Sequence, residues 1–127
     1  MKRILITGAS GMLGAELCST LQDKFDIYSY EKLSSHSSKG LDITNKDEVN
    51  LSIASVKPHI IINCAAFTNV DKAEVNKAES RDVNVVGLMN ILKACSKDVK
   101  IIFSHHEVLH EVWTFVVYFI HFYDVYQ

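Results

Sequence analysis

Two apolar periodicities alternate along the first hundred residues. Short continuous apolar runs, typical of strands buried on both faces, alternate with longer segments whose apolar residues recur every three or four positions, as on a helix face. The pattern predicts strands at 3–7, 26–30, 59–63 and 100–104. It predicts helices from about residue 11, from about residue 44 and over 77–95. This alternation indicates parallel strands joined by right-handed helical crossovers.

Boundary signals support the same elements. The apolar faces of the three helices consist of Leu13, Leu17 and Leu21, then Val49, Ile53 and Val56, then Leu88, Ile91, Leu92 and Cys95. Thr44 with Asp47 three residues later indicates a capping box, Pro58 ends the second helix, and the serine-rich stretch 34–40 is expected to be a loop. We therefore expect an α/β fold, the incomplete first half of a doubly wound sheet. About four parallel strands in the order 3-2-1-4, counted along the chain, would have helices on both faces.

Three glycines follow the first strand at intervals of three residues. Gly8 permits a sharp exit from the strand, Gly11 lets backbone approach a pyrophosphate, and Gly14 lets the following helix pack close to the sheet. The N-terminal amides and dipole of that helix favour phosphate charge. A strand, a glycine turn and a helix in this order predict a dinucleotide-binding site, with a plain turn that holds no ligand as the alternative.

The composition limits the kinds of binding partner and the cellular compartment that we expect for this chain. The chain has 127 residues, 48% hydrophobic and 22% charged, as in one soluble globular domain, and its net charge of −2 gives no reason to expect nucleic acid or an anionic membrane. Cys18, Cys64 and Cys95 are expected to be buried free thiols in a reducing compartment. The apolar run after Met1 is too short for a signal peptide, so we expect a cytoplasmic protein.

Four motifs carry a resemblance to a known family. They are TGASGMLG at 7–14, LDIT at 41–44, NCAAFTNVDKAE at 63–74, which is the most specific, and VNVVG at 83–87. Residues 1 to about 104 resemble the N-terminal part of the dTDP-4-dehydrorhamnose reductases, which are extended short-chain dehydrogenase/reductase enzymes with a Rossmann-type NAD(P)-binding domain. The resemblance implies an oxidoreductase that reduces a dTDP-4-keto-6-deoxy sugar in nucleotide-sugar and polysaccharide biosynthesis.

The same resemblance implies which residues bind the cofactor. The glycine turn, with Gly8, Ser10, Gly11, Met12 and Leu13, would hold the pyrophosphate. Asp42 and Ile43 would border the adenine, Ala65 and Ala66 would line the ribose and nicotinamide side, and Thr68 would lie near them. Structural alternatives stay open: Asp42 as a turn residue, the alanines as packing residues, Asp71 and Glu74 as a helix cap, and Asn84 as a partner of backbone groups.

The choice of cofactor depends on a few charged residues. Glu31 lies where an acidic residue would bond the ribose 2′-hydroxyl of NAD, whereas Lys32 or Arg3 would meet the 2′-phosphate of NADP. The resembling family accepts NADPH and often NADH. We expect NADP(H), with NAD(H) as the alternative.

The chain departs from the family pattern after Ser104. The family continues with a Ser/Thr-Thr-Asp-type turn and later a Tyr-x-x-x-Lys, whose lysine lowers the pKa of the proton-donating tyrosine. No lysine follows Lys100, and residues 105–127 contain no glycine, proline or arginine but four of the six histidines. We expect a half-domain at 1–104 and a divergent tail at 105–127 from a frameshift or a splicing error. As given, the chain would be catalytically incomplete, and a nucleotide sugar would be a partner only of a full-length form.

The tail contains one chemical motif and one apolar run. His106, Glu107 and His110 match the zinc-protease pattern His-Glu-x-x-His, which binds zinc from one face of a helix. The residues that follow do not supply the expected third ligand, so adventitious binding of zinc or nickel is favoured over a catalytic zinc site. The nine residues from Val112 to Ile120 are too few to span a bilayer. We expect them to lie as a helix or strand over the strand at 100–104 and cover its edge.

Three alternatives to the reductase hypothesis remain from the sequence. One is a non-catalytic nucleotide-binding module, like the regulatory subunit of methionine adenosyltransferase. The second is a nucleotide-sugar epimerase or dehydratase, and the third is a zinc hydrolase. The oligomeric state is left open.

Overall fold

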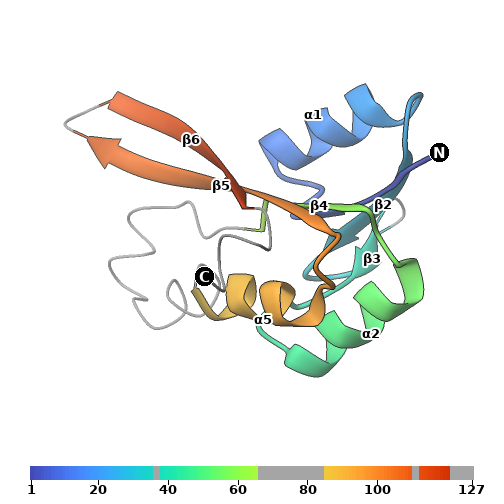
Figure 1. The fold of residues 1–127 in the computed structure, drawn as a ribbon. Helices are drawn as coiled ribbons and strands as arrows, with labels where there is room; N and C mark the ends of the chain where they lie inside the picture. Colours follow the sequence, from blue (N-terminus) through green and yellow to red (C-terminus); the bar gives the residue numbers. More distant parts are fainter. Residues whose placement is uncertain (36–37, 66–84, 110–111, 121–127) are drawn as a thin grey trace.

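A single mixed sheet forms the centre of the molecule (Figure 1). The computed structural model describes residues 1–35, 38–65, 85–109 and 112–120, with side chains up to residue 103. Within this part the strand order is β3-β2-β1-β4-β5-β6. The strands are β1 (Arg3–Thr7), β2 (Asp26–Glu31), β3 (Lys39–Gly40), β4 (Ile60–Asn63), β5 (Lys100–Leu109) and β6 (Val112–Ile120). β1 to β5 are parallel, and β6 runs antiparallel to β5.

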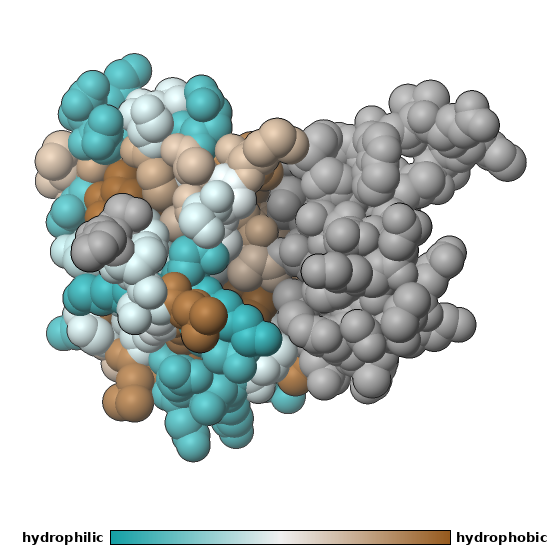
Figure 2. Space-filling view, turned by 180° about the vertical axis from the view of Figure 1, so that it is seen from behind, coloured by the Kyte–Doolittle hydropathy of each residue, from teal (hydrophilic) through white to brown (hydrophobic). Residues whose placement is uncertain are grey.

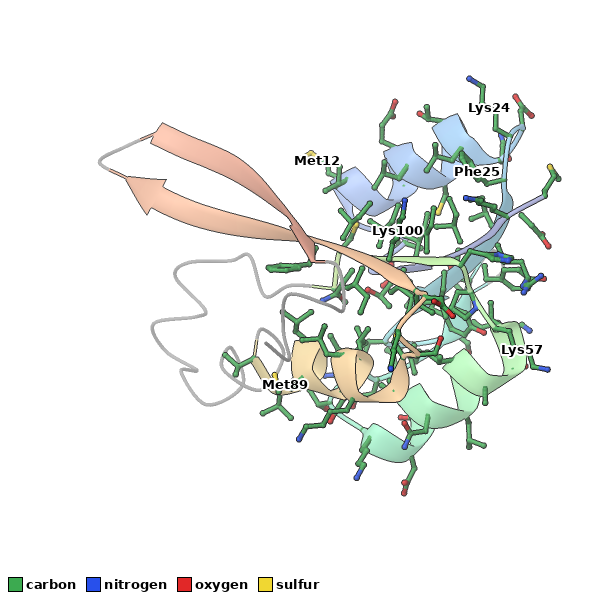
Figure 3. The ribbon with its side chains drawn as sticks, viewed as in Figure 1. Met12, Lys24, Phe25, Lys57, Met89 and Lys100 are labelled. Atoms are coloured by element: carbon green, nitrogen blue, oxygen red, sulfur yellow. The ribbon has the colours of Figure 1, made fainter. Side chains whose placement is uncertain are left out.

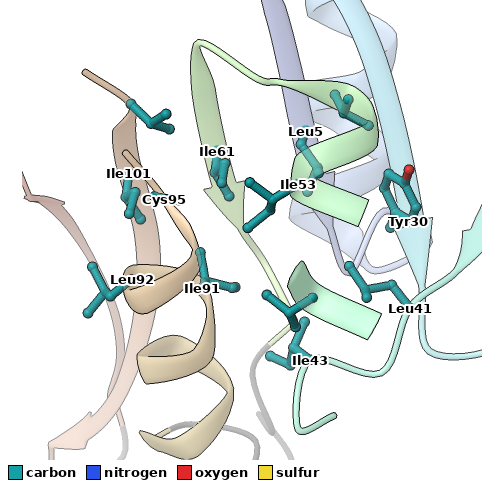
Figure 4. Close-up of a cluster of buried hydrophobic side chains, with 13 residues drawn as sticks. Leu5, Tyr30, Leu41, Ile43, Ile53, Ile61, Ile91, Leu92, Cys95 and Ile101 are labelled. Atoms are coloured by element: carbon teal, nitrogen blue, oxygen red, sulfur yellow. The ribbon is translucent and has the colours of Figure 1, made fainter. Parts of the chain in front are cut away.

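Helices cover both faces of the sheet, as the alternating pattern predicts (Figure 1). They are α1 (Met12–Leu21), α2 (Lys46–Val56) and α5 (Gly87–Ala94). Leu17, Cys18 and Leu21 of α1 pack against Ile4, Ile6 and Ile62 on one face. On the other face α2 and α5 enclose a larger core around Leu5, Ile61 and Ile101 (Figure 4). Successive residues of β1 and β4 thus enter opposite cores, which explains their continuous apolar runs.

The sheet contains the expected order 3-2-1-4 when the strands of the structure are numbered along the chain. Strand 3 in that order, however, is not the one that the sequence predicts. Lys39–Gly40, predicted as loop, pairs with Tyr30 and Glu31 of β2 and forms the edge. The predicted strand 59–63, counted third from the sequence, is β4 and pairs with β1. Two residues carry too little apolar pattern to be recognised as a strand, so the sequence missed β3 and its place beside β2.

The N-terminus of α2 corrects the predicted cap. Asn45, not Thr44, is the N-cap: its side-chain oxygen accepts hydrogen bonds from the backbone N–H groups of Asp47 and Glu48 at 3.1 and 3.2 Å. The Thr44 hydroxyl instead donates to Asp42. Both residue types cap helices well, and the backbone path that places one residue later at the helix start decides between them.

Arg3 contacts the C-terminus of α2. Lys57 adopts a left-handed conformation with φ 51° before Pro58, and its N–H donates to the Ile53 carbonyl at 2.8 Å. The Arg3 guanidinium Nε donates to the carbonyls of Val56 and Lys57 at 3.0 and 2.9 Å. Arg3 therefore stabilises the amino edge of the sheet.

Helix α5 approaches the chain between β3 and α2 at a glycine. A Cβ on Gly87 would lie 2.5 Å from Cδ1 and 2.7 Å from Cγ1 of Ile43, which is 4% exposed. We expect Gly87→Ala to lower the free energy of unfolding by about 1.5 kcal/mol, because overpacking displaces a buried side chain.

The second residue of that contact provides the control for this prediction. Ile43→Val removes Cδ1, so the double variant with Gly87→Ala should lose less stability than the sum of the two single variants in urea unfolding. Strict additivity would contradict the contact.

The last two strands extend beyond the rest of the sheet (Figure 1). β4 pairs with only the first four residues of β5, whereas β6 pairs with β5 from Ile101 to Leu109. The run 112–120 is therefore a strand that covers the edge of β5, as expected. β5 also continues past the predicted end at 104, so His106 and Glu107 lie in a strand and not in the helix that a His-Glu-x-x-His site requires. His110 lies outside the described residues. None of the helices described is long and apolar enough to cross a membrane.

Candidate functional site

The turn between β1 and α1 is built around Gly8. This residue has a φ of +63°, a conformation that favours glycine. A Cβ at Gly8 would lie 2.5 Å from the carbonyl carbon of Cys64 and 2.7 Å from the backbone nitrogen of Ala65. Both conformation and space therefore exclude a side chain here, and the turn rests directly on the backbone that follows β4. This places it at the carboxyl edge of the parallel strands, where open α/β sheets bind ligands.

The other two glycines differ in their surroundings. A Cβ at Gly14 would lie 2.1 Å from the carbonyl oxygen of Gly8, so α1 packs on the turn only because Gly14 has no side chain. A Cβ at Gly11 would meet only that same oxygen, at 3.4 Å. Gly11 is exposed and thus leaves the outer side of the turn open.

Helix α1 begins with unshielded donors. Its N-cap, Gly11, contributes no side-chain hydrogen bond, and the first turn contains no acidic residue. The first hydrogen bond of the helix runs from the Ala15 N–H to the Gly11 carbonyl and is 2.9 Å long. The N–H groups of Met12 and Leu13 come before it in the chain and therefore have no acceptor within the helix. Met12 is 88% exposed and marks the accessible start of the helix (Figure 3). An anion placed here would meet free N–H groups and the positive end of the helix dipole.

Glu31 reaches this turn from the end of β2. Its carboxylate accepts a hydrogen bond from the backbone N–H of Ser10. Its backbone is held by the Leu41 N–H, which donates to the Glu31 carbonyl at 2.6 Å. The structure thus brings Glu31 and Ser10 together, although 21 residues separate them in the sequence.

The negative charge of Glu31 also affects the pKa values of two thiols, Cys64 and Cys18. Burial raises the pKa of Cys64 to about 11, with smaller contributions from Cys18 and from the Glu31 carboxylate. Burial also raises the pKa of Cys18, and Glu31 adds to that shift. Burial raises the pKa of Cys95, the C-cap residue of α5, to about 12. All three cysteines are free, as predicted, but Cys18 and Cys64 are only half-buried.

Asp42 and Ile43 lie in a turn before α2. Oδ1 of Asp42 accepts from the Thr44 hydroxyl at 2.7 Å and from the Thr44 N–H at 3.0 Å, which makes Asp42 a turn residue, whatever else it contacts. The Ile43 side chain is buried in the core, and its carbonyl accepts from Nδ2 of Asn90 at 2.9 Å. Asn90, which the sequence did not single out, ties this turn to α5.

The Asp42 turn has a pH dependence that can be measured. Its hydrogen bonds from Thr44, helped by the charge of Lys32, hold the Asp42 pKa below its usual value of 3.8. A lowered folded-state pKa stabilises the fold above pH 3.8, and this contribution is lost as the pH falls through the folded-state value. We expect Asp42→Asn to lose less stability than the wild type between pH 4 and pH 2, in urea unfolding at a series of pH values. Thr44→Val should flatten the profile in the same direction, and an unchanged profile in both variants would contradict the assignment.

A buried polar pair joins the carboxyl ends of β1 and β4. The Thr7 hydroxyl donates to Oδ1 of Asn63 at 2.6 Å, and that oxygen also accepts from the Ala65 N–H at 3.3 Å. Thr7 is 2% and Asn63 6% exposed. Sequence patterns did not single out this pair, although a polar residue at the end of each apolar strand was a visible signal. Ala65 packs partly buried against the larger core.

Some predicted residues lie elsewhere. Arg3 is bound to the C-terminus of α2 at the opposite edge of the sheet, so it cannot meet a phosphate at the glycine turn. Lys32 follows Glu31, and its positive charge lowers the pKa of Asp42. Lys32 therefore lies at the carboxyl edge of the sheet, on the same side as the glycine turn. Ala66, Thr68, Asp71, Glu74 and Asn84 lie outside the described residues.

The described residues offer no cluster of metal ligands. On the face seen in Figure 2, hydrophilic and hydrophobic residues are interspersed. No group of three or more His, Cys, Asp or Glu side chains that could hold a metal ion occurs among the described residues. The glycine turn, with Ser10 and Glu31, is therefore the arrangement that carries the functional argument.

Comparison with known proteins decides the family. The family described as "RmlD substrate binding domain" matches residues 1–106. This chain belongs to that family. It is 47% identical over 94 residues to a dTDP-4-dehydrorhamnose reductase of Aggregatibacter actinomycetemcomitans, covering 74% of this chain and 31% of that relative. A second such reductase, from Mycolicibacterium smegmatis, is 41% identical over 95 residues, which cover 75% of this chain and 27% of the relative.

Solved structures agree with the family. The RmlD-family chain is similar to a dTDP-4-dehydrorhamnose reductase of Bacillus anthracis in complex with NADP, with 39% identity and a TM-score of 0.66 over 73% of this chain and 31% of that one. An L-threonine dehydrogenase of Clostridium difficile shares 27% identity and a TM-score of 0.71, covering 80% of this chain and 35% of that one. The doubly wound, Rossmann-type fold is thus established for the matched part. The chain spans roughly a third of the length of these relatives.

Proposed function

We propose that residues 1–104 are the dinucleotide-binding half of an NADP(H)-dependent dTDP-4-dehydrorhamnose reductase-like enzyme. The parent reaction would reduce a dTDP-4-keto-6-deoxy sugar in nucleotide-sugar and polysaccharide biosynthesis. The glycine turn carries the proposal, since the turn at Gly8 and Gly14 has no room for a Cβ and supports an open, uncapped helix N-terminus. Relatives named as reductases of this class support the choice of reaction.

The residues of the turn fit a dinucleotide. The glycine turn, including Ser10, would hold the pyrophosphate, with the N–H groups of Met12 and Leu13 as donors, since the Gly11 N–H donates to the Gly8 carbonyl at 3.2 Å. Glu31 would lie beside the ribose of the adenosine end. Asp42 and the Ile43 backbone would border the adenine, while Ala65, Ala66 and Thr68 would follow the cofactor toward its nicotinamide. The bound cofactor would supply a hydride. This chain would position it from the carboxyl edge of the sheet.

The proposal also specifies the cofactor, the binding of the nucleotide sugar and the cellular compartment. We propose NADP(H) over NAD(H), a choice supported by the similar Bacillus anthracis reductase, whose structure is a complex with NADP. The nucleotide sugar would bind only in a full-length form, because no lysine follows Lys100 and the family's Tyr-x-x-x-Lys therefore has no counterpart after that strand. A cytoplasmic setting, with neither nucleic acid nor a membrane as partner, fits nucleotide-sugar chemistry and the net charge of −2.

Binding of NADPH to the full chain tests the proposal. A fluorescence titration is expected to show saturable binding, without oxidation of NADPH when a dTDP-4-keto-6-deoxy sugar is added. Gly11→Asp should weaken binding at least about tenfold, because it places a negative charge where the phosphate would lie. Its matched control, Gly11→Asn, has nearly the same shape and caps the helix as well, but it adds no charge.

The outcomes separate binding from folding. A Cβ at position 11 meets only the Gly8 oxygen, at 3.4 Å, so both variants should fold. Equal affinities for the Asp and Asn variants would remove the phosphate from this turn. Absence of NADPH binding by the wild type would overturn the proposed function.

We also propose a boundary near residue 104, with a tail at 105–127 that comes from a shifted or wrongly spliced reading frame. The change in composition and the family match, which ends at residue 106, support it. Sequencing the transcript and the genomic DNA beyond the codon for Lys100 tests it. The expected result is an alternative frame that leads into a Tyr-x-x-x-Lys, and a continuous frame with no such alternative would contradict it.

A further inference from the structure

One edge of the sheet ends in a long apolar strand. β6 is the last strand in the order β3-β2-β1-β4-β5-β6, and within the described residues no strand pairs with its outer edge. Its nine residues, Val112–Ile120, include no charged residue, glycine or proline. Successive pairs from Ile101–Ile120 to Leu109–Val112 join it to β5, so no bulge interrupts the strand. Such an edge offers a row of backbone N–H and C=O groups to another strand.

The opposite edge of the same sheet is protected against further pairing. β3 is only two residues long, both residues are exposed, and one of them is Lys39. Short length and lysine are among the features by which natural sheets prevent edge-to-edge pairing. β6 has neither feature, so the two ends of the sheet differ in their capacity to accept another strand.

The hairpin of β5 and β6 also lacks a third described strand beyond Phe103. β4 pairs with β5 only from Lys100 to Phe103, and the two strands project past the rest of the sheet (Figure 1). A two-stranded hairpin is marginally stable in water, and three or more strands are needed for independent stability. A further strand along β6 would therefore stabilise the hairpin as well as pair with its edge.

We propose that two copies of this chain pair through β6, antiparallel about a two-fold axis, and so form one sheet that continues across both copies. This inference goes beyond the proposed function and does not depend on cofactor binding. Full overlap of two nine-residue strands puts the axis at the central residue. Val116 of one copy then opposes Val116 of the second copy.

The sequence of β6 is complementary to itself in this register. The opposed residues are all aromatic or β-branched: Val112 with Ile120, Trp113 with Phe119, Thr114 with Tyr118, and Phe115 with Val117. Cross-strand pairs of these types stabilise antiparallel sheets. No like charges meet across the axis, because β6 contains no charged residue. The contact uses the same strand in both copies, so it closes at two.

The other open edge of the hairpin is a poorer partner for β6. The residues of β5 that β4 does not reach begin with Ser104, His105, His106 and Glu107. Pairing β6 with this edge would set polar residues opposite apolar ones. It would also join two different strands, and a head-to-tail contact of that kind propagates into filaments if its rotation does not close. The closed pair through β6 is therefore the favoured arrangement.

Sedimentation of the full chain over a range of concentrations tests the proposal. The wild type is expected to be a dimer that dissociates on dilution. Val116→Lys and Val116→Glu each place two like charges opposite each other at the axis, so either variant alone should dimerise about tenfold more weakly. An equimolar mixture of the two should restore dimerisation, because opposite charges then meet. The control, Val116→Thr, keeps the β-branch without adding charge and should remain a dimer.

Hydrogen exchange of the wild type provides a second measurement that needs no variant. Antiparallel pairing engages every second residue of a strand, so alternate amides of β6 should become protected as the concentration rises. A monomer at every concentration, or a dimer whose β6 amides stay unprotected, would overturn the inference. It would also fail if the two charged variants paired no better mixed than alone, or if the wild type grew with concentration beyond two copies.

Discussion

Gly14→Ala is expected to lower the free energy of unfolding by about 3 kcal/mol. Alanine in a helix interior normally gains about 1 kcal/mol over glycine, so an ordinary helical glycine would predict the opposite sign. Here the added Cβ would lie 2.1 Å from the Gly8 carbonyl oxygen and 2.9 Å from Cα of Ala9. Both neighbours are backbone atoms of a turn that rests on Cys64, so neither can move without displacing the turn from the sheet.

Gly11→Ala is the matched control for this change. Its Cβ would approach the Gly8 oxygen to only 3.4 Å, and we expect a change in stability of less than about 1 kcal/mol. Urea unfolding of the wild type and the two variants measures both effects. Because the turn is also the proposed phosphate site, Gly14→Ala should weaken NADPH binding even where it remains folded. Equal stability of Gly14→Ala and Gly11→Ala would show that α1 does not pack on the turn as described.

Asn63→Ala is expected to cost about 3 kcal/mol of stability, although it removes no apolar group. The Thr7 hydroxyl and the Ala65 N–H would both lose their acceptor, and a buried polar group without a partner costs about 1–3 kcal/mol. Water cannot readily replace the lost oxygen, since Thr7 is 2% exposed. The pair also joins β1 to β4 just before the backbone that supports Gly8.

A double-mutant cycle separates the pair from simple loss of volume. Thr7→Val should cost only about 1 kcal/mol, because Asn63 keeps its bond from Ala65. In Thr7→Val with Asn63→Ala no hydroxyl is left without an acceptor, so the double variant should be more stable than the sum of the single losses implies. Additive losses in urea unfolding would contradict a coupled pair.

Local periodicity was sufficient to find most elements, for a physical reason. A strand buried on both faces must be apolar at every position, and a helix on a sheet must be apolar every three to four residues, so β1, β4 and α2 are visible in the pattern. The glycine turn was equally visible, since a left-handed φ at Gly8 and a close helix at Gly14 both require the absence of a side chain. These are local demands, and each is met by the residue at its own position.

The predictions from sequence that were wrong concern contacts between residues that are distant in the sequence. Which strand lies beside β2 depends on pairing energies along whole edges, and the two residues of β3 were too short to signal it. Arg3 is a positive charge next to β1 in the sequence, but its partners, the carbonyls of Val56 and Lys57, are defined only once α2 has packed. The cap at Asn45 likewise depends on how the chain enters α2 after the Asp42 turn.

The amino-acid order was therefore enough to establish the alternating α/β architecture, the glycine turn and the family resemblance, because each rests on side-chain size and spacing within one segment. Folding was needed to place Glu31 on Ser10, to join Thr7 to Asn63 and to bury Ile43 beneath Gly87. These contacts link residues that lie 21 to 56 positions apart in the sequence. Their geometry follows from the packing of complete elements on the sheet, and no local pattern encodes it.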